Sequence, residues 1–143
     1  MDSMLLRAGI AAMLLALAAC GGGGGDEGPP PPTGLQPTLA SIQANVFTPT
    51  CAVMGCHTGP MAMLGLRLDA NFSASSLINV PSFYGTGLVR LVPGDSDNSF
   101  LIQKLEGTTN LGGQMPLNGN ALQQVTIQVI REWIESCSTN ACP

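Results

Sequence analysis

The 143-residue sequence has only one histidine, His57, so any chemistry that needs an imidazole must use this residue. Positive charge is also scarce: five lysines and arginines stand against nine acidic residues, and the net charge is −4. A surface that binds phosphate backbones needs clustered basic side chains, so nucleic acid is not expected as a partner. The length fits one domain with appendages and leaves no room for a second enzyme domain.

Aromatic residues make up only 4% of the chain, and no sustained period-two alternation or internal repeat is found. Helical periodicity occurs at both ends of the region after residue 37, with glycine- and asparagine-rich loops between. We therefore expect an all-α fold, a small helical domain with long loops. A core with so few large side chains is marginal on burial alone, so a buried apolar group would complete it.

The chain has no apolar run long enough to span a bilayer comfortably. The longest follows Arg7 and covers residues 8–19, which predicts a signal peptide at residues 1–19 and an exported protein. Leu17-Ala18-Ala19-Cys20 resembles the lipobox of bacterial lipoproteins, which implies lipidation of Cys20. The alternative is that Cys20 is a small residue beside an ordinary cleavage site. Gly21, in place of an acidic residue, resembles the outer-membrane sorting class.

Residues 20–36 contain a glycine run and four consecutive prolines, a composition typical of an extended linker. We expect it to tether a folded domain, residues 37–143, to the membrane through the lipid on Cys20. The domain would then face the periplasm or the cell surface.

Two helices are predicted at the ends of this domain. The first covers residues 38–47, begins at Thr38 as N-cap and ends at Thr48-Pro49. The second is introduced by Asn120 and Gln123 as a capping pair, and its apolar face comprises Leu122, Val125, Val129, Ile130, Trp133 and Ile134.

Shorter elements are expected between these helices. They are a turn at 75–77 and a helical stretch at 97–105. Asp95 and Asp97 are interpreted as turn and N-cap groups, not as a catalytic carboxylate pair.

Four residues carry the chemistry: Cys51, Cys56, His57 and Met115. Two thiols can form thioether bonds to haem vinyl groups, an imidazole can ligate one iron face and a thioether sulfur the other. The pattern predicts one covalently bound haem c, and the single histidine excludes a second histidine-ligated haem. The usual attachment motif has two residues between the cysteines, whereas residues 52–55 make four here. They must bulge outward, which Gly55 makes easier.

The order of several short motifs resembles that of class I c-type cytochromes, and more closely a bacterial cytochrome-c-like domain of exported proteins. They are Cys56-His57-Thr58-Gly59-Pro60, Gly65-Leu66-Arg67-Leu68-Asp69, Leu91-Val92-Pro93-Gly94-Asp95, Ser99-Phe100-Leu101, Gln114-Met115-Pro116 and Trp133-Ile134. The resemblance implies attachment through Cys51 and Cys56, with His57 as the proximal and Met115 as the distal iron ligand. It also implies that a loop carbonyl orients the imidazole. The implied function is electron transfer with transient redox protein partners, not enzymatic catalysis.

Alternatives remain for the cysteines. Cys51 and Cys56 could form a disulfide in a haem-free, disulfide-stapled surface lipoprotein that acts as a binding module. Cys137 and Cys142 have the same spacing but are followed by Pro143, so we expect them to form a disulfide. All four together could instead bind zinc.

Alternatives remain also around the iron. Met54, Met61 and Met63 are other candidate thioether ligands, and an open distal face would suit a peroxidase. Arg67 could pair with a haem propionate or be a surface charge. Trp133 is expected to be a core residue first and a haem neighbour second.

Overall fold

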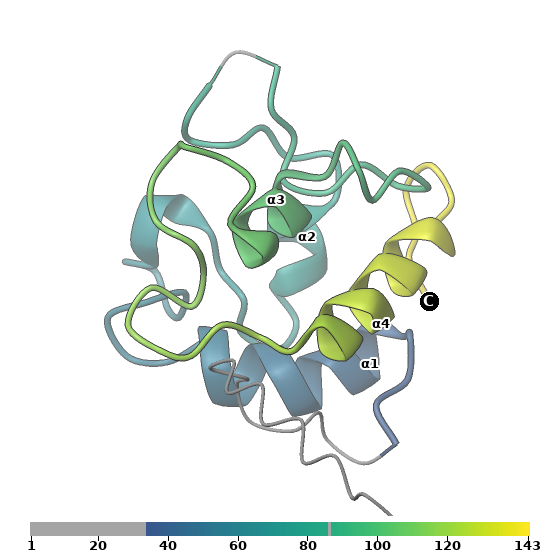
Figure 1. Cartoon of the computed structure of the whole chain (residues 1–143), viewed down its shortest axis with the longest axis horizontal. Coiled ribbons are helices and arrows are strands. Elements are labelled where there is room, and N and C mark those ends of the chain that lie inside the picture. Colours follow the sequence, from purple (N-terminus) through teal and green to yellow (C-terminus); the bar gives the residue numbers. More distant parts are fainter. Residues whose placement is uncertain (1–33, 86) are drawn as a thin grey trace, which may run out of the picture.

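The computed structural model describes residues 34–143 with the exception of residue 86, and shows a mainly helical chain with long loops (Figure 1). In the described part, β-structure is limited to isolated bridges such as that between Ile78 and Leu91. The helices, in chain order, are α1 (Leu39–Ile42), the π-helix η1 (Gln43–Cys51), the 3₁₀ turn η2 (Met63–Gly65), α2 (Ser73–Leu77), α3 (Phe100–Glu106) and α4 (Gln124–Glu135).

The first helix begins as the sequence predicts, because the Thr38 side chain accepts a hydrogen bond from the amide of Ser41 at 3.3 Å. Its predicted end at Thr48-Pro49 is wrong: α1 continues directly into η1, which includes Pro49 and ends at Cys51. Proline lacks an amide donor and its ring crowds the carbonyl four residues earlier in an α-helix. The wider turn of a π-helix changes that register, so the helix extends to the first cysteine.

The first and last helical segments meet in the core. The rings of Phe47 in η1 and Trp133 in α4 pack edge to face, with centroids 6.2 Å apart. Both side chains are fully buried or nearly so. Around them lies one apolar cluster formed by residues of α1, η1, α2, α3, α4 and the connecting loops: Ile42, Val46, Leu68, Leu77, Leu91, Leu101, Ile102, Leu105, Ile127, Ile130 and Ile134.

Helix α4 differs from the prediction in its start and in part of its face. Gln123, and not Asn120, occupies the N-cap position. Val125 was expected to face the core but is 52% exposed, whereas Ile127 is 1% exposed. The buried face of α4 is formed by Thr126, Ile127, Ile130, Trp133 and Ile134, which follow helical spacing and leave Val125 outside it.

The predicted helix at 97–105 forms only from Phe100 onward, as α3. Asp95 makes the predicted turn, since its carboxylate accepts hydrogen bonds from the amide and side chain of Asn98. Asp97 was expected to be the N-cap of this helix, but Ser99 occupies that position. The Asp97 carboxylate instead pairs with Arg131 of α4 at 2.6 Å, and Arg131 also pairs with Glu106 at the end of α3. These ion pairs join α4 to both ends of the α3 segment.

The two ends of the described domain are joined. A disulfide links Cys137 and Cys142, the pair predicted from the sequence. The amide of Leu39, at the start of α1, donates a hydrogen bond to the carbonyl of Pro143 at 2.6 Å. The predicted signal peptide, Cys20 and most of the linker lie outside the described residues. Among those described, no helix is long and apolar enough to cross a membrane.

Candidate functional site

The first residues of the candidate site are two cysteines, Cys51 and Cys56. They have the same spacing as the carboxy-terminal cysteine pair but, unlike that pair, do not form a disulfide. Cys51 and Cys56 are free thiols, although Cys137 and Cys142, also five positions apart, are bonded at 2.01 Å. The structure thus differs from the alternative of a Cys51–Cys56 disulfide. It also differs from a four-cysteine zinc site, because two of the four sulfurs are bonded to each other.

The chain between the free thiols forms a compact bulge, as the wide spacing requires. The amide of Cys56 donates to the carbonyl of Val53 at 3.0 Å, and the amide of His57 donates back to the carbonyl of Cys51 at 3.1 Å. Gly55 makes this turn at φ 80°, a conformation that costs glycine little. Cys51 lies at the end of η1 against the core. Burial, with a smaller effect of Cys56, raises its pKa to about 12.

His57 is oriented by a carbonyl from another part of the chain. Its Nδ1 lies 3.1 Å from the carbonyl oxygen of Leu66, nine residues later. A carbonyl can only accept, so Nδ1 carries the proton and the lone pair is on Nε2. Burial lowers the pKa of His57, and the partial compensation by the Leu66 carbonyl does not reverse this. A neutral imidazole with its Nε2 lone pair available is the form that binds a metal.

A second set of hydrogen bonds fixes the backbone around His57. The carboxylate of Asp69 accepts from the Thr58 hydroxyl and from the amide of Gly59 at 3.1 Å. The amide of Leu68 donates to the carbonyl of His57 at 2.8 Å. Residues 57–59 and 66–69 are therefore joined by hydrogen bonds to both the side chain and the backbone of His57 and to the two residues after it. We call these two segments the bracket.

Arg67 belongs to this bracket. Its side chain was expected to pair with a haem propionate or to be a surface charge, and its contacts in the structure are with other residues of the chain. Its Nε donates to Asp69 at 2.9 Å, and its guanidinium lies 3.4 Å from the ring centroid of Phe72. It is a partly exposed charge with a structural partner. Trp133 is a core residue as expected, and its buried Nε1 has no hydrogen-bond partner among the described residues.

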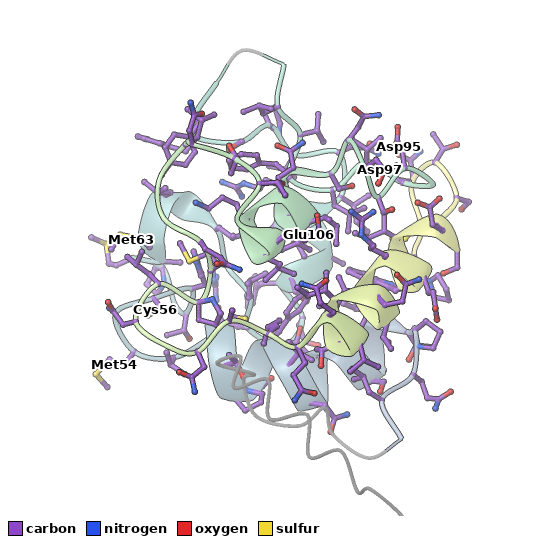
Figure 2. The ribbon with its side chains drawn as sticks, in the orientation of Figure 1. Met54, Cys56, Met63, Asp95, Asp97 and Glu106 are labelled. Atoms are coloured by element: carbon purple, nitrogen blue, oxygen red, sulfur yellow. A yellow bond between two sulfur atoms is a disulfide. The ribbon has the colours of Figure 1, made fainter. Side chains whose placement is uncertain are left out.

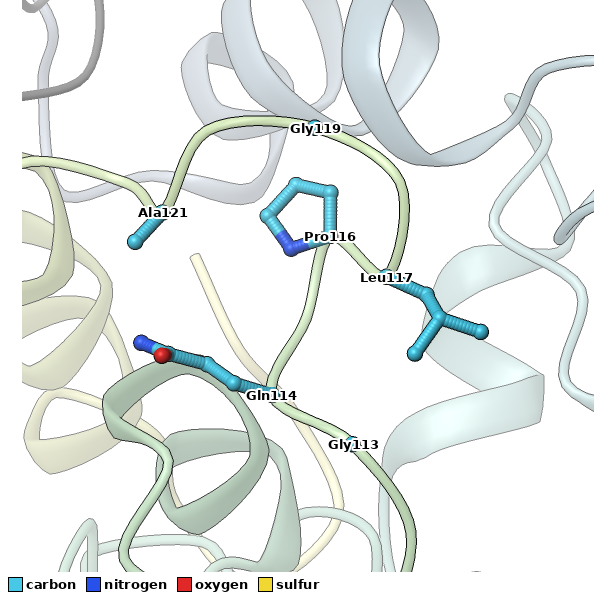
Figure 3. Close-up of a pocket in the computed structure, with 6 residues that line it drawn as sticks. All are labelled: Gly113, Gln114, Pro116, Leu117, Gly119 and Ala121. Atoms are coloured by element: carbon cyan, nitrogen blue, oxygen red, sulfur yellow. The ribbon is translucent and has the colours of Figure 1, made fainter.

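Met115 lies in the long loop between α3 and α4. It is partly buried and packs against the same apolar cluster as Cys51 and Leu66. Its amide donates to the carbonyl of Lys104 at 2.8 Å. The loop around it borders a hollow of about 320 Å³, lined by Gly113, Gln114, Pro116, Leu117, Gly119 and Ala121 (Figure 3).

Exposed apolar side chains concentrate on the two loops that carry the candidate ligands. Among the described residues, eleven large hydrophobic side chains are exposed, and seven of them lie within 53–64 or 111–117: Val53, Met54, Met61, Met63, Leu64, Leu111 and Leu117. Figure 2 shows Met54, Cys56 and Met63 at one side of the molecule, away from Asp95 and Asp97. Apolar surface gathered in this way favours a site that is covered by an apolar group.

The other candidate thioethers are all exposed. Met54 and Met61 are 95% and 92% exposed, and Met63 is 55% exposed. Met115 is the one among the four that packs against the apolar cluster. The sequence interpretation did not identify two polar residues of the site, Asp69 and Lys104. Two features of the sequence could have identified them: Asp69 ends the motif Gly65-Leu66-Arg67-Leu68-Asp69, and Lys104 is the only lysine of the chain.

Comparisons leave the site to be judged on its own geometry. No protein-family model, no curated protein and no solved structure matches the chain.

Proposed function

We propose that the protein is a monohaem c-type cytochrome that transfers electrons in the cell envelope, anchored as a lipoprotein through Cys20. The observation that carries the proposal is the contrast between the two cysteine pairs: the pair followed by histidine stays unbonded, and the pair followed by Pro143 is bonded. Free thiols in an exported chain require a purpose other than structural pairing. Thioether formation with haem vinyl groups is that purpose when an imidazole follows directly.

The donor set of the chain fits this group. Cys51 and Cys56 would hold the haem covalently, His57 would ligate through Nε2 and Met115 through its sulfur. A haem bound in this way supplies a reversible one-electron couple, and a thioether ligand favours its reduced form. The chain's own residues orient the group: Leu66 fixes the imidazole and Asp69 fixes the loop after it. The exposed apolar residues of 53–64 and 111–117 would shield a bound haem from water.

The carboxylate of the bracket around His57 is already used in hydrogen bonds, which suits a role in holding the loop. Asp69, the carboxylate nearest in the bracket, is engaged by Thr58, Gly59 and Arg67. Weak, small docking surfaces are typical of redox partners, and the exposed apolar rim could provide one.

Intact-mass spectrometry of the mature protein, expressed in a host with haem-attachment machinery, tests the proposal. We expect the mass of the chain from Cys20 with lipid and one added haem that remains bound under denaturing conditions. A colourless chain without the added mass would contradict the proposal. A disulfide between Cys51 and Cys56 in that chain would favour the alternative, a haem-free binding module.

A further inference from the structure

The loop that carries Met115 is fastened to the end of α3 by reciprocal hydrogen bonds. In one direction, the carbonyls of Lys104 and Leu105 accept from the loop: from the amide of Met115 at 2.8 Å and from the side chain of Gln114 at 2.8 Å. In the other direction, the ammonium of Lys104 donates to the carbonyls of Leu111, at 3.0 Å, and Gly113. One residue, Lys104, takes part in both directions.

The environment of Lys104 indicates that its charge serves this loop. The residue is 8% exposed, although lysine is rarely buried to this degree without a partner. No carboxylate pairs with it in the described part of the chain. Its ammonium is held by loop carbonyls, with the ring of Tyr84 6.0 Å away. Burying an ammonium is costly unless its donors are satisfied, so the contacts to Leu111 and Gly113 are obligatory.

The geometry leaves little freedom for the segment between these contacts. Gly112 lies between the two carbonyls, at φ 76°, and an added Cβ would come within 2.5 Å of the Tyr84 hydroxyl. Tyr84 in turn packs edge to face on Phe100 of α3, with centroids 5.7 Å apart. The loop from 111 to 115 is therefore confined by Lys104 and by the aromatic pair, since an added Cβ on Gly112 would meet both the Tyr84 hydroxyl and, at 3.3 Å, the Lys104 ammonium.

From this arrangement we infer that Lys104 is the positioning residue for Met115: it clamps residues 111–115 to α3 and so presents the methionine sulfur at a fixed place. This inference rests on the proposed function for the iron-ligating part, whereas the clamp itself does not depend on it. Without the ammonium, the carbonyls of Leu111 and Gly113 lose their donor, and two hydrogen bonds then remain between α3 and residues 114–115. The distal ligand would then be held loosely or lost.

Hydrogen exchange on the full-length purified protein tests the clamp whether or not haem is present. In Lys104→Met, which keeps the stem and removes the donors, the hydrogen-bonded amides of 107–121, above all that of Met115, should exchange roughly tenfold faster or more, because hydrogen bonds to a charged group are lost. Exchange in α4 should change much less. Arg131→Met is the matched control: it removes one positive charge from a helix, and its partners Asp97 and Glu106 lie outside the methionine loop.

The iron arm tests the positioning. In the haem-loaded Lys104→Met protein, the absorption band of thioether-ligated ferric iron should weaken and the reduction potential should fall further than in Arg131→Met. Lys104→Arg, which keeps a charged donor, should restore part of both. Lys104→Gln serves as a second variant if the methionine variant does not fold.

The outcomes separate the two proposals. Unchanged exchange of 107–121 would overturn the clamp. Faster exchange with an unaltered iron spectrum, or a fall in potential equal to that in Arg131→Met, would overturn the positioning role. If intact mass shows no haem, the proposed function fails together with the ligand-positioning part, and exchange alone then decides the clamp.

Discussion

The Nδ1 of His57 and the carbonyl of Leu66, 3.1 Å apart, fix both the tautomer and the direction of the only imidazole in the chain. Leu66 directly follows η2, and its position is maintained by the hydrogen bond from Leu68 back to His57. The orientation of a metal-binding histidine by a carbonyl is a general device for increasing ligand basicity. Here the two residues lie nine positions apart in one loop, and the variants below change residues on both sides of this contact.

Replacement of Met115 by alanine should remove the distal thioether and leave the haem covalently bound. Loss of a ligand that stabilises ferrous iron should lower the reduction potential, by an amount on the order of 0.1 V. The measurements are redox titration and the visible spectrum of the ferric protein. Met54→Ala is the control, since this side chain is 95% exposed and should leave both unchanged. Unaltered spectra in Met115→Ala would show that another residue ligates.

The two cysteine pairs should respond to substitution in opposite ways. Cys51→Ala or Cys56→Ala should leave haem attached by one bond at most, and the double substitution should abolish covalent attachment, as read by intact mass. The double change of Cys137 and Cys142 to serine should retain haem and lower the free energy of unfolding by about 2 kcal/mol, the loop-closure entropy of so short a bridge. Denaturant titration checks the second effect. Equal haem loss in both double variants would contradict the division of roles.

Gly112→Ala should destabilise the protein by two separate effects. An alanine at φ 76° costs roughly 1 to 2 kcal/mol, and displacement of the Tyr84 hydroxyl from the 2.5 Å approach adds a similar amount. Gly87→Ala isolates the first effect, because Gly87 has φ 84° and open space around its Cβ position. The difference in the free energy of unfolding between the variants measures the contact. No difference would mean that the loop lies farther from Tyr84 in solution.

The stability of the protein should decrease in acid through Asp69. Hydrogen bonds from Thr58, above all, and from Arg67 and Gly59 hold the pKa of this carboxyl below its usual 3.8. The folded state therefore gains from the ionised form above the unfolded pKa, and the gain is lost as the pH falls below 3.8 toward the folded pKa. Asp69→Asn should flatten this part of the pH dependence of unfolding.

Thr58→Val is the companion variant for Asp69. It removes the hydroxyl donor and leaves the carboxyl in place, so it should reproduce part of the flattening. A wild-type slope below pH 4 in both variants would show that the bracket contributes nothing to acid sensitivity.

What could be predicted from the sequence is local. The Thr38 cap, the helix that contains Trp133, and the Cys137–Cys142 bridge depend on neighbouring residues or on short spacing, and they appear in the structure. The passage of η1 through Pro49 was missed because proline is read as a helix stop, whereas a π-helical register accommodates it.

What could not be predicted depends on contacts between distant segments. Asp97 was assigned to a helix cap because of its place before α3, but its partner is Arg131, 34 residues later. The Leu66 carbonyl and the Lys104 ammonium likewise acquire their roles only when loops fold back on themselves. No periodicity or spacing encodes such contacts.

The hydrogen bond between Leu39 and Pro143 brings the beginning and the end of the described domain together. Figure 1 shows this junction on the side of the carboxy terminus, and Figure 2 shows Met54, Cys56 and Met63 at the opposite edge. A tether attached upstream of Gly34 would consequently enter the domain near its carboxy terminus. If Cys20 is lipidated as proposed, the edge that carries Cys56 lies far from the point where the tether enters the domain, so a partner could approach that edge without displacing the tether.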